Sequence, residues 1–131
     1  MTTPISNVLN YFYTEFQSTI ELPEDLVKQF LLKAIGEFEL NLYPINYDLE
    51  NEVFQYDLST TEMSLLGKIM YKHYLSRERD RILKLNNIVG KDISLTSMGA
   101  SKSEIRQAYE DVVEEIERTF SRLKESSFYK W

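Results

Sequence analysis

Hydrophobic side chains recur at helical spacing over three long segments of this chain. The clearest begins just after Pro23, where apolar residues return every four positions, a spacing that places them on one face of an α-helix. Its stripe consists of Leu26, Phe30, Ala34, Phe38 and Leu42. Proline and acidic residues suit a first helical turn, so we expect this helix to start near residues 23–25. It should end before Pro44, because proline disfavours helical geometry in the preceding residue.

Two further segments carry a wide apolar stripe and begin at residues that favour helix starts. Ser59 precedes Glu62 by three positions, which is the spacing of a capping box. Ser101 and Glu104 repeat that spacing. We expect the second long helix to run from this first box to Gly90, which can stop it. The stripe of the last helix, expected to be central to the core, comprises Ile105, Tyr109, Val112, Ile116, Phe120 and Leu123.

The segments between these helices and before them have weaker patterns. The first apolar residues recur at helical spacing, and Ser6 is a possible N-cap. They are Val8, Leu9, Phe12 and Phe16. The aromatic run at residues 11–16 is also compatible with a strand, but we expect a short helix. Residues 44–58 have no helical period and are expected to form an ordered loop that packs a few aromatic side chains.

Two other segments are expected to lie outside the helices. Residues 91–99 alternate apolar and polar side chains next to glycines, a pattern typical of an extended, protruding loop. The apolar side chains of that loop are Ile93, Leu95 and Met98. Residues 125–131 follow the last stripe and form a predicted C-terminal tail, whose aromatic residues are Phe128, Tyr129 and Trp131. Aromatic side chains favour burial, so this tail either packs along its own helix or binds another protein.

These elements predict an all-α fold: a small bundle of three main helices with a short N-terminal helix, a protruding extended loop and a C-terminal tail. The 131 residues suit a single domain with its own core, spanning residues 1–131. No run of about 18 apolar residues is present, so no membrane span is expected. The chain has no cysteine, which excludes disulfides and thiolate metal sites.

Charge is distributed unevenly along the chain. Residues 1–67 carry two basic and eleven acidic side chains, whereas residues 68–91 carry seven basic and two acidic ones. The acidic half can fold against the basic segment of the same molecule, or one copy can dock on the next. The net charge of −6 argues against a general nucleic-acid binder.

Candidate chemistry is sparse. His73 is the only histidine, and without a second histidine or a cysteine it cannot complete a metal or nucleophilic site of the usual kinds. Met70 stands where a Glu-x-x-His motif would need its carboxylate, and phosphate-loop motifs are absent. We therefore expect a core or boundary histidine, no catalytic residue, no cofactor or metal site, and no enzyme.

The basic cluster SRERDR has two interpretations. Arg77 and Arg81 are four residues apart and share a helix face, so together they can contact a phosphate group. Glu78 and Asp80 stand between them, and the same cluster can be a solvated helix surface with its own salt bridges.

The order of these elements resembles that of the head–tail adaptor proteins of long-tailed bacteriophages, also called connector or head-completion proteins. The matching segments are LPEDLVKQFLLKAIGEFEL, STTEMSLLGKIMYKHYL, ISLTSMGASKSEI and the last helix with its tail. The resemblance is architectural and covers about Leu22 to Trp131, without a diagnostic motif. The segment before it is additional, and the acidic connection at 44–58 is longer than in the shortest members.

The resemblance implies a structural virion protein of the neck region, made in the host cytoplasm. Such proteins form a ring, usually twelvefold, between the portal protein and the stopper or tail, and genomic DNA passes through without specific binding. In this chain the tail aromatics Phe128, Tyr129 and Trp131 would bind the portal. The loop residues Ile93, Leu95 and Met98 would contact neighbouring subunits or the tail side. The alternative is a small acidic regulatory protein that binds and inhibits a protein partner.

Overall fold

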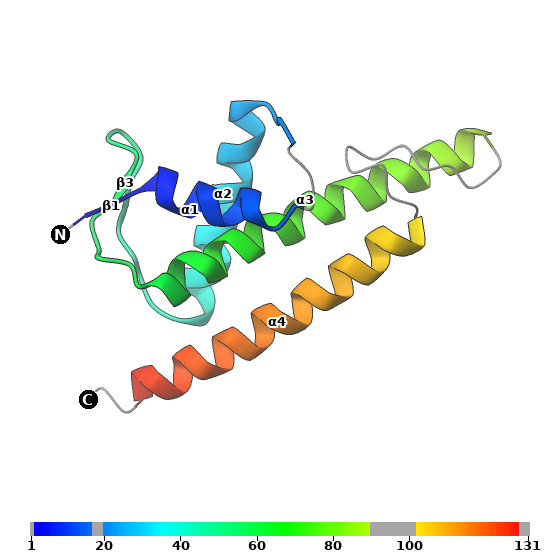
Figure 1. Cartoon of the computed structure of the whole chain (residues 1–131). Coiled ribbons are helices and arrows are strands. Elements are labelled where there is room, and N and C mark those ends of the chain that lie inside the picture. Colours follow the sequence, from blue (N-terminus) through cyan, green and yellow to red (C-terminus); the bar gives the residue numbers. More distant parts are fainter. Residues whose placement is uncertain (1, 17–19, 90–101, 129–131) are drawn as a thin grey trace.

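The computed structural model describes the backbone of residues 2–16, 20–89 and 102–128, and side chains within 2–16, 20–84 and 103–125. These parts form four helices and one small sheet (Figure 1). The helices are α1 (Ile5–Thr14), α2 (Glu24–Asn41), α3 (Thr60–Val89) and α4 (Lys102–Phe128). The strands are β1 (Thr3–Pro4), β2 (Tyr47–Asp48) and β3 (Val53–Phe54). The predicted all-α bundle of three main helices and a short N-terminal helix is confirmed.

Helix α3 is the axis of the molecule. Helices α1 and α2 pack on one side of it, and α4 runs back along the other side (Figure 1). Six α3 side chains that the structure describes have no exposed surface: Leu65, Leu66, Ile69, Met70, Leu75 and Ile82. The centre of the core is therefore α3, and not α4 as the sequence suggested.

Helix α1 crosses α3 at Gly67. A Cβ atom at this position would lie 2.9 Å from the backbone nitrogen of Phe12 and 2.9 Å from the carbonyl carbon of Tyr11. Only glycine allows the two helices to approach this closely. Nearby, Lys68 Nζ lies 2.9 Å from Glu15 Oε1 and 3.5 Å from Glu115 Oε2. One partly buried cation of α3 therefore joins α4 to the C-cap residue of α1.

The start of α3 is capped as predicted. The backbone N–H of Glu62 donates to Ser59 Oγ (3.2 Å), and the backbone N–H of Ser59 donates to Glu62 Oε1 (2.8 Å). The hydroxyl of Tyr43 donates to the other oxygen of Glu62. The predicted cap of α1 is wrong: Pro4 occupies the N-cap without a side-chain hydrogen bond, and Ser6 lies inside the helix.

Residues 44–58 contain more structure than the expected loop. Strands β2 and β3 form an antiparallel hairpin, and β1 pairs with the other edge of β3, giving the order β1-β3-β2. Thr3 Oγ1 donates to the carbonyl of Tyr56 and accepts from the backbone N–H of Leu58, both at 3.0 Å. The small sheet thus ties the start of the chain to the segment that leads into α3.

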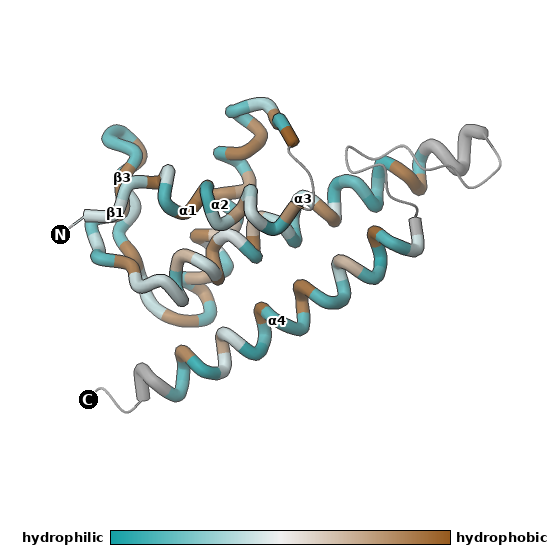
Figure 2. The backbone as a smooth tube through the Cα atoms, in the orientation of Figure 1, coloured by the Kyte–Doolittle hydropathy of each residue, from teal (hydrophilic) through white to brown (hydrophobic). Residues whose placement is uncertain are grey.

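Helix α4 presents its predicted stripe to α3. Ile105, Val112, Ile116 and Phe120 are buried, and Figure 2 shows hydrophobic positions separated by hydrophilic turns along this helix. The helix continues to Phe128, so residues 125–128, which we assigned to the tail, are helical. The loop at 91–99 and residues 129–131 lie outside the described residues.

Candidate functional site: a basic groove and an acidic hairpin

A groove of about 550 Å³ lies between the first half of α2 and the second half of α3. We call it the basic groove. Its walls are formed by Leu26, Gln29, Phe30, Lys33, His73, Ser76, Arg77, Asp80, Arg81 and Lys84. The α3 members recur at three- and four-residue steps, which places them on one face of that helix. Leu26 and Phe30 supply an apolar floor from one face of α2.

The rim of the basic groove carries an excess of positive charge. Arg81 NH1 lies 3.4 Å from the carboxylate of Glu78, whose side chain is only 5% exposed. Lys33, Arg77 and Lys84 form no ion pair with any side chain that the structure describes. These cations therefore remain available to an acidic ligand.

His73 lies at the inner edge of the groove, as a half-buried boundary residue. Its Nε2 lies 2.9 Å from Glu37 Oε1, although the contact is not aligned as a hydrogen bond. Lys72 Nζ lies 2.6 Å from the other oxygen of Glu37. Burial lowers the pKa of His73, and the neighbouring cations Lys72 and Lys33 add to that effect, while Glu37 opposes it. Protonation of the imidazole is therefore disfavoured, and the positive charge of the rim comes from its lysine and arginine side chains.

The second surface is the turn of the β2–β3 hairpin, which we call the acidic hairpin (residues 47–54). Asp48 organises it: its Oδ1 accepts hydrogen bonds from the backbone N–H groups of Glu50 (3.0 Å) and Asn51 (3.2 Å). The side-chain amide of Asn51 also donates to Asp48 Oδ2 at 2.7 Å. This bond, followed by the backbone ones, holds the pKa of the Asp48 carboxyl below its usual value. Leu49 stands beside Glu50 in this turn with 65% of its surface exposed.

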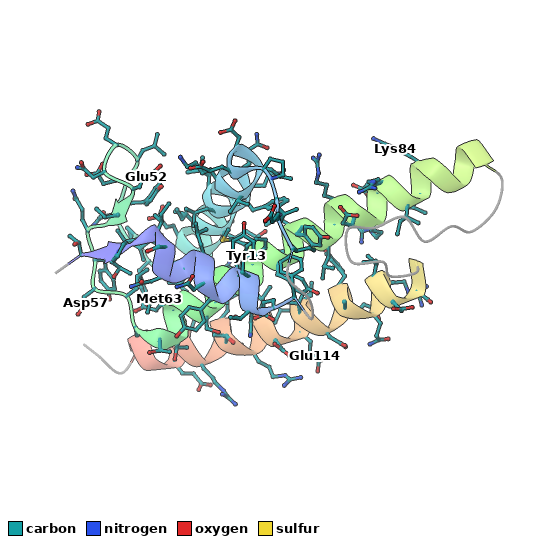
Figure 3. The ribbon with its side chains drawn as sticks, turned by 45° about the horizontal axis from the view of Figure 1, so that its top comes forward. Tyr13, Glu52, Asp57, Met63, Lys84 and Glu114 are labelled. Atoms are coloured by element: carbon teal, nitrogen blue, oxygen red, sulfur yellow. The ribbon has the colours of Figure 1, made fainter. Side chains whose placement is uncertain are left out.

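The acidic hairpin and the basic groove lie on opposite sides of α2. Glu52 Oε1 of the hairpin lies 2.6 Å from Lys28 Nζ on α2. Lys28 is two residues from both Leu26 and Phe30, which is about 200° around a helix. In Figure 3 the labelled Glu52 and Lys84 lie at opposite ends of the molecule. One chain thus presents two surfaces of opposite charge that cannot meet each other.

The predicted site residues have different outcomes. The loop residues Ile93, Leu95 and Met98 and the tail residues Phe128, Tyr129 and Trp131 lie outside the described side chains. The interpretation of the basic cluster as a salt-bridged helix surface is confirmed in part: Arg81 pairs with Glu78, and the guanidinium of Arg79 lies 4.8 Å from the ring of Tyr109. Arg77 instead faces the groove. Phosphate binding by Arg77 and Arg81 stays a prediction.

Sequence reasoning missed two members of these surfaces. Lys33 is 44 positions from Arg77, and only the packing of α2 on α3 brings them to one groove. Leu49 could have been identified from the sequence, because it is an apolar residue among acids in a segment without a helical period.

No protein-family model, no curated protein and no solved structure matches the chain. Within the described residues, no three histidine, aspartate or glutamate side chains are placed to hold a metal ion. None of the helices traced there is both long and apolar enough to cross a membrane. The two charged surfaces are therefore the features on which a functional proposal can rest.

Proposed function

We propose that this protein is a structural assembly protein of a phage particle, which forms a ring in the neck between the portal protein and the stopper or tail. The observation that carries the proposal is the pair of oppositely charged surfaces on opposite sides of α2. Two different surfaces that complement each other on one molecule support head-to-tail association, and a head-to-tail contact that closes forms a ring.

The charge of the whole chain supports the same role. A channel for genomic DNA must let a densely negative polymer pass without pairing to its phosphates. A net charge of −6 suits such a channel wall, provided that the cations of the groove are covered by neighbouring chains. The architectural resemblance to head–tail adaptors supplies the proposed neighbours, namely the portal on one side and the stopper or tail on the other.

The mass in solution tests this proposal. We expect the purified protein to form higher oligomers, either alone at high concentration or when mixed with its portal, in native mass spectrometry. Particles assembled without it should lack joined tails in electron micrographs. If the protein stays monomeric both alone and with the portal, and tails still join in its absence, it would instead match a small regulatory binder.

Portal binding is assigned to Phe128, Tyr129 and Trp131, whose large side chains suit interface anchors. Trp131 is the only tryptophan, so its fluorescence reports on this segment alone. We expect emission at a water-exposed wavelength in the isolated protein and a blue shift on portal binding. Deleting residues 129–131 should abolish binding and leave the melting temperature unchanged. Blue-shifted emission from the isolated chain, with lower stability after deletion, would show that the tail packs against the core of the same molecule.

A further inference from the structure

We infer that the acidic hairpin of one copy docks in the basic groove of the next copy, with Leu49 on the floor formed by Leu26 and Phe30. The inference rests on the proposed function, because it names the contact that would build the ring. It commits to a second copy of this chain as the occupant of the groove.

Charge complementarity is the first argument. The groove offers Lys33, Arg77 and Lys84, which have no ionic partner among the described side chains. The hairpin offers Glu50, an exposed carboxylate whose side chain likewise makes no hydrogen bond or ion pair there. Complementary charges orient two chains before contact and disfavour wrong partners. The unpaired groups of the two surfaces are therefore opposite in sign.

The apolar match is the second argument. Leu49 lies in an acidic turn and keeps 65% of its surface in water, so most of its apolar surface is not buried by its own fold. The groove has an apolar floor beneath a cationic rim, and interfaces commonly bury an apolar centre inside such a polar rim. The turn of the hairpin likewise places an apolar side chain, Leu49, next to a charged one, Glu50.

The hairpin is also held ready for binding. Asp48 fixes the turn through hydrogen bonds to the backbone of Glu50 and Asn51, and Glu52 attaches it to Lys28. A loop that already has its bound shape loses less conformational freedom on association. The hairpin sits on the far side of α2 from its own groove, so it can fill only the groove of another molecule.

Disulfide cross-linking tests the contact, and the absence of native cysteine makes it clean. Leu49→Cys and Gln29→Cys place thiols on the hairpin and on the exposed lining of the groove. Under mild oxidation, the double variant should give a ladder of covalent multimers beyond the dimer. A mixture of the two single variants should stop at the dimer. The matched control, Leu49→Cys with Arg122→Cys on the exposed side of α4, should give no ladder.

A charge exchange tests the ionic part. Glu50→Arg and Arg77→Glu should each weaken self-association by roughly tenfold or more, as expected for a close charge pair. The two changes together should restore most of it. Glu117→Arg and Arg122→Glu, at exposed positions of α4, should leave association unchanged. Sedimentation velocity at low ionic strength measures all five variants.

The outcomes separate the two proposals. If every charge variant still forms normal oligomers and the double-cysteine variant gives no ladder, the hairpin contact is overturned. The proposed assembly role would still stand. A double-cysteine variant that stops at a dimer would show a reciprocal two-fold contact and overturn the head-to-tail arrangement. If a short oligonucleotide binds the wild type but not Arg77→Glu, the groove is a nucleic-acid site. That result would also overturn the hairpin contact. A wild type that neither self-associates nor binds the portal would remove the proposed function itself.

Discussion

The two halves of α3 are built differently, although they belong to one continuous helix. Between residues 62 and 75 most side chains are buried, because α1, α2 and α4 enclose the helix. Between residues 76 and 84, only Glu78 and Ile82 are buried. The enclosed half supplies most of the core side chains of α3, and the open half carries Arg77, Arg81 and Lys84 of the groove. One continuous helix therefore contributes to the core at one end and lines a charged groove at the other.

Aromatic packing concentrates stability in the enclosed half. The ring of Phe16 makes edge contacts with Tyr71 and Tyr74 at 5.1 and 4.9 Å between centroids. The ring of Phe12 lies 5.3 Å from Phe16 and 6.2 Å from Phe30. Aromatic pairs at these distances add to the gain from burial alone. Changes in this cluster should cost more than changes in the α4 stripe.

The largest effect is expected for Phe12→Ala. Phe12 has no exposed surface, so its removal should leave a cavity and lower the free energy of unfolding by about 3–5 kcal/mol. Phe120→Ala, where the ring is 8% exposed on the edge of α4, should cost about 3 kcal/mol, the lower end of that range. Urea denaturation measures both. A larger loss at Phe120 would show that α4 holds as much of the stability as the enclosed half.

Gly67→Ala tests the close crossing of α1 and α3. The added methyl group would meet backbone atoms of α1 at 2.9 Å, so we expect a loss of about 1–3 kcal/mol, as for overpacked cores. Gly36→Ala is the matched control, because nothing lies within 4 Å of its Cβ position. It should stabilise the protein by about 1 kcal/mol through helix propensity. Equal effects of the two changes would mean that α1 and α3 can move apart enough to accept the added methyl group.

Ser59→Ala tests the cap of α3. Removing the hydroxyl that accepts from Glu62 should cost about 1 kcal/mol, a typical value for an N-cap. Ser6→Ala is the control at the position where the sequence alone suggested a cap, and it should leave the melting temperature nearly unchanged. A comparable loss at Ser6 would indicate that α1 begins later than Ile5.

The smallest effect is expected from protonation of His73. Its pKa is below 6.5 in the folded protein because of burial, so the unfolded chain takes up this proton first. Stability should therefore fall as the pH drops through about 6.5 towards the folded pKa. His73→Gln should remove that part of the slope, and thermal melts from pH 7.5 to 5 measure the difference. An unchanged slope would mean that Glu37 offsets the effect of burial.

Local pattern in the sequence predicted a large part of this fold. The spacing of apolar residues located all three long helices, and the Ser59–Glu62 spacing located the cap of α3. The apolar stripe predicted for α4 is the face that packs on α3. Each of these features depends on residues within one or two turns of each other, so periodicity and capping chemistry suffice to find them.

Tertiary structure decided the rest. Strand β1 pairs with β3 about 50 positions away, and two-residue strands have no period to detect. The basic groove joins Lys33 of α2 to Arg77 of α3, and its apolar lining comes from Leu26 and Phe30 of α2. Contacts of this kind depend on how helices pack, and packing is set by the summed burial of many side chains rather than by any short stretch of sequence.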